Sequence, residues 1–159
     1  MVRFIIRKHK TDITMNTALL QLAELSRLYG SDPDYVFLGG GNTSVKIGNV
    51  MYIKPSGAAL ATIQPEQFLA LDRTALQDIL RFDTAALDSA AREAAVKDAL
   101  SAAVRPCHAG RPSVEALAHH LLEYQFVVHL HPTAVNGLTC ARDGKTACRR
   151  IFPDALWLD

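Results

Sequence analysis

Two histidines, His129 and His131, stand at the end of an apolar segment and are the residues best spaced to share a ligand. The segment 126–131 is rich in β-branched and aromatic residues, which is typical of a buried strand. Residues i and i+2 of a strand point to the same face, so the two imidazoles could bind one metal ion. The alternative is that one histidine ends the strand while the other faces solvent. The spacing alone leaves both interpretations open.

A carboxylate, Glu115, lies upstream near the start of a predicted helix. Pro112 and Ser113 predict that this helix covers residues 114–122, which places Glu115 in its first turn and His119 one turn later on the same face. The positive end of the helix dipole is one sufficient explanation for a glutamate there, and the histidine could simply be partly buried. Beside a metal ion, the carboxylate could instead ligate the ion or act as a general base. The His-x-His pair favours this second hypothesis.

Two glycine-containing turns offer groups that can bind phosphate. Residues 39–44 read Gly-Gly-Gly-Asn-Thr-Ser, and residues 54–57 read Lys-Pro-Ser-Gly. Such turns expose backbone N–H groups, to which Asn, Thr and Ser side chains add donors. Neither is a Walker loop or a dinucleotide fingerprint, because the triple glycine lacks a following Lys-Ser/Thr and leads into a predicted hairpin. The alternative is two tight turns that need positive φ angles, but the two turns together with Ser113 favour a phosphate site.

The composition limits the classes of partner. The chain has 159 residues, of which 49% are hydrophobic and 21% charged, as expected for one soluble globular domain. Its 17 basic and 16 acidic residues are spread along the chain and give a net charge of +1, so we expect no nucleic-acid partner. We also expect no membrane partner, because no apolar stretch approaches the roughly 20 residues that a membrane helix requires.

The three cysteines, Cys107, Cys140 and Cys148, indicate the compartment. They are odd in number and show no C-x-x-C spacing, and three thiols cannot all pair within one chain. A reducing environment fits best, with the cysteines as small buried hydrophobic residues. We therefore predict a cytoplasmic protein.

Helices and strands must position these groups, and hydrophobic periodicity predicts where they lie. Gly30 is predicted to cap the first helix in a left-handed conformation, and residues 47–49 to form a hairpin turn. The alternation of helices with short strands predicts an α/β fold with a mixed sheet covered by helices on both faces. The predicted helices cover residues 16–29, 74–80, 88–104, 114–122, 133–139 and 145–152, and the predicted strands cover residues 44–46, 50–54, 68–72, 126–131 and 155–158.

The two ends of the chain carry further expectations. Met15 opens the first periodic segment, so residues 1–14 are expected to be a disordered extension or a misassigned start, and the domain to cover residues 15–159. The chain stops at Asp159, directly after an apolar run that resembles a core strand needing a neighbour. We therefore expect the domain to be truncated at its C-terminus.

Four segments together resemble the class II aldolase/adducin family, in particular the N-terminal part of fuculose- and rhamnulose-1-phosphate aldolases. They are residues 39–46 (GGGNTSVK), 54–57 (KPSG), 111–115 (RPSVE) and 126–132 (FVVHLHP). The resemblance covers the chain from about residue 19 to residue 159 and implies a three-layer α/β/α domain. The helical insertion between Phe68 and Pro106 suggests the subgroup that contains rhamnulose-phosphate aldolases and the aldolase half of bifunctional aldolase/dehydrogenase proteins.

The resemblance also implies a site. In the family a zinc-type divalent ion is held by three histidines, of which His129 and His131 match the first two, and Glu115 matches the catalytic acid/base. The positions that bind the substrate phosphate are matched by Asn42, Ser56, Gly57 and Ser113.

The family's third histidine lies well downstream, and no histidine follows His131 in this sequence. Two imidazoles alone would bind zinc weakly, because catalytic zinc takes three protein ligands and an open position. Glu115 could take the third place, but it could not then act freely as a base. We therefore expect this polypeptide alone to be weakly active or inactive.

The activity that the resemblance implies is cleavage of a ketose 1-phosphate to dihydroxyacetone phosphate and a small aldehyde such as lactaldehyde. The metal would stabilise the enediolate that forms as the carbon–carbon bond breaks. The family also implies a homo-oligomer, a tetramer. Two alternatives stay open: a sugar-phosphate epimerase or dehydratase on the same scaffold, and a non-catalytic scaffold domain of the adducin kind.

Overall fold

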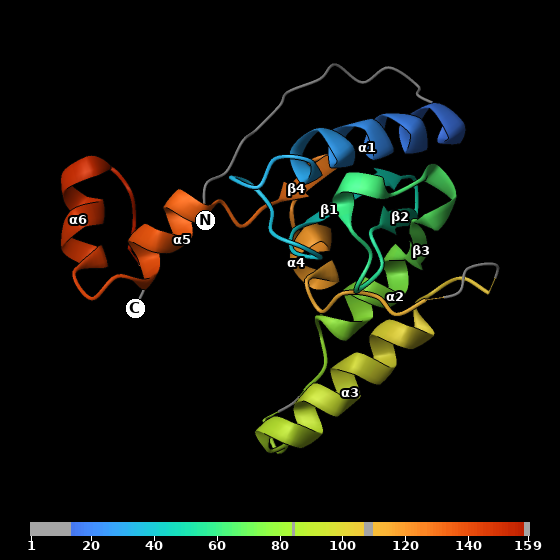
Figure 1. Ribbon diagram of the computed structural model, residues 1–159. Helices are drawn as coiled ribbons and strands as arrows, with labels where there is room; N and C mark the ends of the chain where they lie inside the picture. The colour runs from blue at the N-terminus through green and yellow to red at the C-terminus, as the bar shows by residue number, and fades with distance from the viewer. Residues whose placement is uncertain (1–13, 84, 107–109, 158–159) are drawn as a thin grey trace.

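A four-stranded antiparallel sheet lies at the centre of the described part of the molecule (Figure 1). The computed structural model describes residues 14–83, 85–106 and 110–157, so the expected extension at residues 1–14 lies almost entirely outside it. The strands follow the order β3-β2-β1-β4 across the sheet. Their bounds are β1 Asn42–Ile47, β2 Val50–Ile53, β3 Leu69–Asp72 and β4 Phe126–His129.

The strand pairings confirm the predicted hairpin and correct the predicted sheet. Ile47 pairs with Val50, so β1 and β2 are joined by a two-residue turn at Gly48 and Asn49. All three pairings between the described strands are antiparallel, where a mixed sheet was predicted. A pattern of alternating helices and strands identifies the α/β class correctly. It does not give strand direction, which depends on how each connection crosses the sheet.

Helices cover both faces of the sheet, which confirms the three-layer α/β/α architecture (Figure 1). Successive residues of a strand point to opposite faces, so Met51 and Tyr52 on β2 belong to different core clusters. Tyr52 and Val45 pack with α1 (Met15–Gly30), whereas Met51 packs with the helices of the opposite layer. Those helices are α2 (Arg73–Ile79), α3 (Ser89–Ala102) and α4 (Ala116–Leu121).

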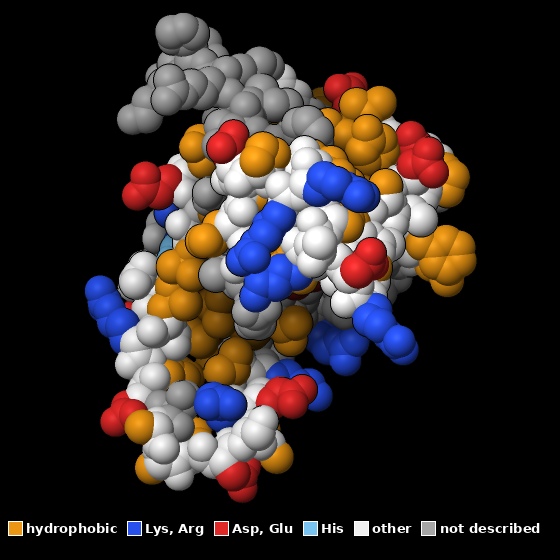
Figure 2. Space-filling view, turned by 90° about the vertical axis from the view of Figure 1, so that its left-hand side faces the viewer, with side chains coloured by type: hydrophobic (Ala, Val, Ile, Leu, Met, Phe, Trp, Pro, Cys, Tyr) orange, Lys and Arg blue, Asp and Glu red, His pale blue; other side chains and the backbone are white. Residues whose placement is uncertain are grey.

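Two further helices, α5 (Thr133–Cys140) and α6 (Gly144–Ile151), contact each other and lie to one side of the sheet (Figure 1). The face on that side carries exposed hydrophobic side chains next to lysines and arginines (Figure 2). The strand predicted at residues 155–158 is wrong for residues 155–157, which form no strand, and residue 158 lies outside the described residues. An apolar run becomes a strand only where another strand pairs with it, and Leu156 is 85% exposed.

No helix in the described ranges combines the length and the apolar character needed to cross a membrane. The two 3₁₀ turns, η1 (Leu60–Thr62) and η2 (Pro65–Gln67), connect β2 to β3 and contact α1.

Gly30 has a different role from the predicted left-handed cap. It is the last residue of α1, and Ser31 follows it as the C-cap in a right-handed conformation. A Cβ atom at Gly30 would overlap the backbone at Ala61 and the side chain of Leu60 in η1. Glycine is therefore needed here because α1 and η1 approach each other closely.

Gly30→Ala is expected to lower the free energy of unfolding by about 1–3 kcal/mol, because the added methyl group has no space. Gly137→Ala in the exposed part of α5 is the matched control, since nothing lies within 4 Å of the added atom. It should be neutral or stabilise by up to about 1 kcal/mol. Urea denaturation of both variants measures the difference, and equal stability of the two would contradict the packing argument.

Candidate functional site

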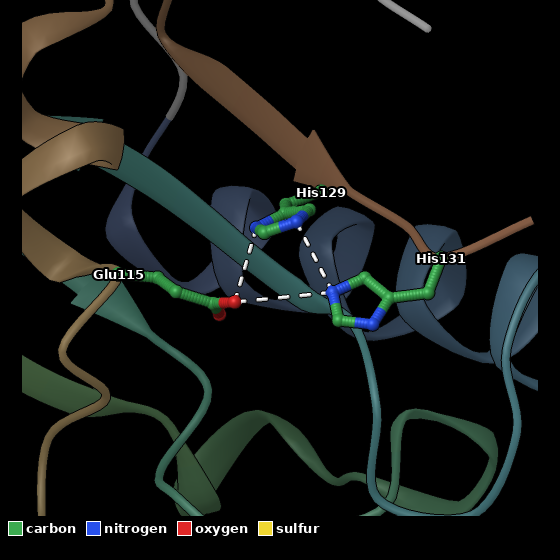
Figure 3. Close-up of side chains that lie close together, drawn as sticks. All are labelled: Glu115, His129 and His131. Atoms are coloured by element: carbon green, nitrogen blue, oxygen red, sulfur yellow. Dashed lines mark hydrogen bonds and ion pairs between the residues drawn. The ribbon is translucent and has the colours of Figure 1, made fainter. Parts of the chain in front are cut away.

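Glu115, His129 and His131 meet at the edge of the sheet where β4 ends (Figure 3). Glu115 Oε1 lies 3.4 Å from His129 Nδ1 and 3.9 Å from His131 Nε2. The Nε2 atoms of the two histidines are 3.2 Å apart. The two rings of the His-x-His pair and the carboxylate therefore converge on one point, although His129 also ends β4 and His131 is exposed.

The sheet and the start of α4 bring these residues together. His129 is the last residue of β4 and pairs with Asn42, the first residue of β1. The backbone N–H of His131 donates to the carbonyl oxygen of Tyr35 (3.1 Å), which fixes the segment after β4. Gly41 has a φ of +71°, and a Cβ there would lie 3.1 Å from the carbonyl oxygen of His129. The triple glycine thus lets its loop pass close to the end of β4.

Glu115 is the N-cap of α4, just before the helix, where the sequence placed it in the first turn. Its side chain makes no capping hydrogen bond, so capping of the helix does not explain its orientation. Oε1 faces the two histidines, while Oε2 accepts hydrogen bonds from Asn42 Nδ2 (3.1 Å) and Ser113 Oγ (3.2 Å). One oxygen is therefore held in place and the other faces the site.

The pKa of Glu115 reflects competing effects. Partial burial raises it, but the hydrogen bond from Asn42, the electrostatic interaction with His129 and the hydrogen bond from Ser113 together lower the pKa of Glu115 below its ordinary value. Glu115 is therefore ionised at neutral pH. An ionised carboxylate can either ligate a cation or accept a proton.

The three side chains fit a small divalent cation. One ligand atom from each residue lies within 4.8 Å of the others. Two ligands at about 2.0–2.1 Å from a tetrahedral zinc ion are about 3.3 Å apart. The short distances here involve Nδ1 of His129 toward Glu115 and Nε2 of His129 toward His131, so a bound ion would take one of these two nitrogens. Two imidazoles and one carboxylate also form a ligand set used by catalytic zinc sites. Among the described residues, Glu115 is the third side chain of this group, beside the two histidines.

The four residues predicted to bind phosphate fall into two places. Asn42 and Ser113 both donate to Glu115, so they join the candidate metal site. Ser56 and Gly57 form a separate turn, in which Gly57 has a φ of +85°. Ser56 N donates to the carbonyl oxygen of Arg111 (2.8 Å), and Arg111 Nη2 donates to Ser56 Oγ (3.1 Å). Within the described part of the chain, no hydrogen bond joins this turn to Glu115.

Lys54 is a residue that the sequence analysis did not single out. Its side chain is almost completely buried, at 2% exposure. Nζ donates to the carbonyl oxygens of Gly39 (3.3 Å), Pro55 (3.4 Å) and Ala58 (2.8 Å). Burial lowers the pKa of Lys54, against a smaller opposite effect of Glu115. Lys54 therefore joins the glycine loop to the Pro-Ser-Gly turn. The available signal was a lysine at the end of a predicted strand, between two glycine-containing turns.

His119, one turn after Glu115, is 1% exposed and accepts or donates a hydrogen bond at Nδ1 with Ser44 Oγ (2.8 Å). Burial, together with the positive charge of His129, lowers the pKa of His119 to about 4. The ring is therefore neutral at pH 7.

This shifted pKa predicts a loss of stability in mild acid. Below the unfolded-state pKa of about 6.5, the unfolded chain binds a proton that folded His119 does not bind. The free energy of unfolding should therefore fall by about 1.4 kcal/mol per pH unit as the pH drops from about 6.5 toward about 4. The measurement is urea denaturation of both proteins with EDTA at pH 7.5 and at pH 5.0. Between these two pH values, the free energy of unfolding should fall by about 2 kcal/mol more in the wild type than in His119→Phe. Equal losses would contradict the burial of a neutral histidine.

Comparisons with known proteins agree with this fold. The model of the family described as Class II Aldolase and Adducin N-terminal domain matches residues 20–155. The solved N-terminal class II aldolase domain of a conserved protein from Thermoplasma acidophilum is 28% identical with a TM-score of 0.68, over 95% of this chain and 70% of that one. YgbL from Klebsiella pneumoniae, named as a candidate aldolase/epimerase/decarboxylase, is 17% identical with a TM-score of 0.56, over 82% of this chain and 51% of its own.

A longer relative is YuxG of Bacillus subtilis strain 168, an uncharacterized oxidoreductase by its name. It is 32% identical over 141 residues, which are 83% of this chain and 20% of YuxG. The chain therefore spans about a fifth of the length of this relative.

Proposed function

Because the chain belongs to the family of class II aldolase and adducin N-terminal domains, we propose that it is the metal-binding domain of a class II aldolase. In this proposal it cleaves a ketose 1-phosphate to dihydroxyacetone phosphate and a small aldehyde. The observation that carries the proposal is the convergence of Glu115, His129 and His131 on one point, with Glu115 ionised. A decayed, non-catalytic scaffold would have no reason to keep these three groups in one arrangement.

His129 and His131 would hold a divalent ion, zinc or another, with Glu115 beside them. When bound, such an ion acts as a Lewis acid toward substrate oxygens. Glu115 holds or moves the proton at Oε1, because Oε2 is already engaged by Asn42 and Ser113. Those two donors also keep the carboxylate oriented, so that the oxygen facing the histidines stays in reach of substrate.

The substrate phosphate would bind at Asn42, Ser56, Gly57 and Ser113. Gly57 supports this assignment because its left-handed backbone lies in a tight turn, the kind of turn whose N–H groups can bind an anion. The Arg111 guanidinium beside Ser56 supplies a positive charge that matches a phosphate. In the free chain Asn42 and Ser113 donate to Glu115, so a phosphate would have to share these donors with the carboxylate.

The relation to YuxG supports the subgroup in which an aldolase domain is joined to a dehydrogenase, since YuxG is named as an oxidoreductase and extends far beyond the matched region.

We also propose that the protein forms a homo-oligomer, a tetramer. This part of the proposal is supported by the family resemblance alone. YgbL is named for more than one activity, so an epimerase or a dehydratase is the second outcome that an assay must distinguish.

The test is an assay of the purified chain with zinc and a panel of ketose 1-phosphates, including rhamnulose 1-phosphate and fuculose 1-phosphate. Dihydroxyacetone phosphate is detected through NADH oxidation by glycerol-3-phosphate dehydrogenase. We expect slow formation of dihydroxyacetone phosphate that a chelator abolishes and added zinc restores. A changed sugar phosphate without cleavage would identify an epimerase or dehydratase. If the chain holds zinc but converts none of these sugar phosphates, the catalytic role is contradicted.

A further inference from the structure

A line of polar side chains joins β1 to α4 behind the candidate metal site. Three β1 residues that alternate along the strand point to the same face. Each reaches a different level of the α4 region: the N-cap, the middle of the helix and the carbonyl oxygens just beyond its end. The contacts are Asn42 with Glu115 (3.1 Å), Ser44 with His119 (2.8 Å), and Lys46 with the backbone oxygens of Leu122 and Tyr124 (2.7 and 2.9 Å).

The spacing of the two elements explains why the contacts match. Two residues of a strand advance by about 6.6 Å, and four residues of a helix by about 6 Å. Asn42 and Ser44 therefore face Glu115 and His119 in step. Directional hydrogen bonds at these levels set where α4 lies along β1, which apolar contacts alone would not do.

The middle contact is the most buried of the three. Ser44 is 0% exposed and His119 is 1% exposed. His119 Nε2 has no hydrogen-bond partner among the described residues, so the orientation of its ring depends on the bond to Ser44. A hydrogen bond between two buried groups is costly to lose.

His119 also touches both sides of the candidate metal site. Its ring centroid lies 6.2 Å from that of His129, with the two rings tilted by 39°. Its backbone N–H donates to the carbonyl oxygen of Glu115 (3.0 Å). A shift of His119 would therefore change the packing of its ring near His129 and displace the backbone of Glu115.

We propose that Ser44 and His119 are positioning residues of the metal site. Their hydrogen bond holds α4 on β1 so that Glu115 and His129 meet at the observed distance. This inference rests on the proposed metal site and adds to it two residues that touch neither the ion nor the substrate.

The test is cobalt(II) titration of the metal-free chain, followed by visible absorption, for Ser44→Ala, His119→Phe and His119→Asn. Loss of groups that orient metal ligands commonly costs 10–100-fold in metal affinity. Ser44→Ala and His119→Phe should therefore raise the Kd for cobalt by about 10–100-fold and change the visible bands. His119→Asn can place an amide where Nδ1 lies, so it should recover most of the affinity and the wild-type bands.

Val45→Ala is the control for a general loss of stability. Val45 lies between Ser44 and Lys46 but is buried on the opposite face, against α1. It should unfold more easily while its cobalt affinity and spectrum stay unchanged. Wild-type affinity in Ser44→Ala and His119→Phe, or an equal loss in Val45→Ala, would overturn the positioning role. A wild-type chain that binds no cobalt would overturn the proposed metal function and this inference with it.

Discussion

Glu115→Gln is expected to lower the rate of ketose 1-phosphate cleavage by about 10²–10⁴-fold, the usual contribution of a positioned acid or base. Glutamine has nearly the same shape but cannot accept the proton. Its amide must also turn its oxygen toward the Asn42 and Ser113 donors, which leaves the –NH₂ group facing the histidines. The loss should appear in kcat more than in KM. Asn42 and Ser113 can still donate to the glutamine oxygen, and the turn at Ser56 and Gly57 makes no hydrogen bond to Glu115 in the described residues.

Glu123→Gln is the matched control for this variant. Glu123 is exposed just after α4 and undergoes the same chemical change away from the site. Its activity should stay within about twofold of the wild type, as expected for an exposed substitution. If Glu115→Gln and Glu123→Gln cleave the substrate at similar rates, Glu115 does not move the proton.

Replacing His129 and His131 together by alanine is expected to remove bound zinc, with a loss of affinity well above 100-fold. Removal of a group that only orients a metal ligand already costs about 10–100-fold in affinity, and this variant removes both of the histidines proposed to hold the ion. The chain should still fold, because neither side chain belongs to the buried core. The measurement is the molar ratio of zinc to chain after dialysis, determined by elemental mass spectrometry for the variant and the wild type.

His120→Gln controls for the general loss of a histidine. His120 Nε2 lies 3.3 Å from Gln77 Oε1, and His120 is not part of the metal-binding group. It should retain the zinc content of the wild type. Zinc retained in the double variant would show that the ion binds at another place on the chain.

Most of the helices and strands could be predicted from local sequence patterns. The helix predicted over 16–29 is α1, and the strands predicted over 44–46, 50–54 and 68–72 lie within a residue or two of β1, β2 and β3. Periodicity and turn residues suffice for such elements because they act between close neighbours in sequence. Strand direction, and the absence of a strand at residues 155–157, depend on which segments meet in space. The sequence pattern does not contain that information.

The candidate site was predictable in its histidine pair and less so in the residues that support the pair. His129 and His131 share a face because of a spacing of two, which is local. Asn42 meets Glu115 across 73 positions, and Ser44 meets His119 across 75, so only the folded sheet reveals these pairs. A run of alternating polar residues on a strand, Asn-x-Ser-x-Lys, was the available signal that one sheet face carries a polar contact with a helix.

The most direct test of the metal site is anomalous diffraction from crystals grown with zinc, with data collected on both sides of the zinc absorption edge. We predict an anomalous peak about 2.0–2.1 Å from one nitrogen each of His129 and His131, on the side of the two rings that faces Glu115 Oε1. A zinc peak elsewhere on the chain, with none between these residues, would contradict the account.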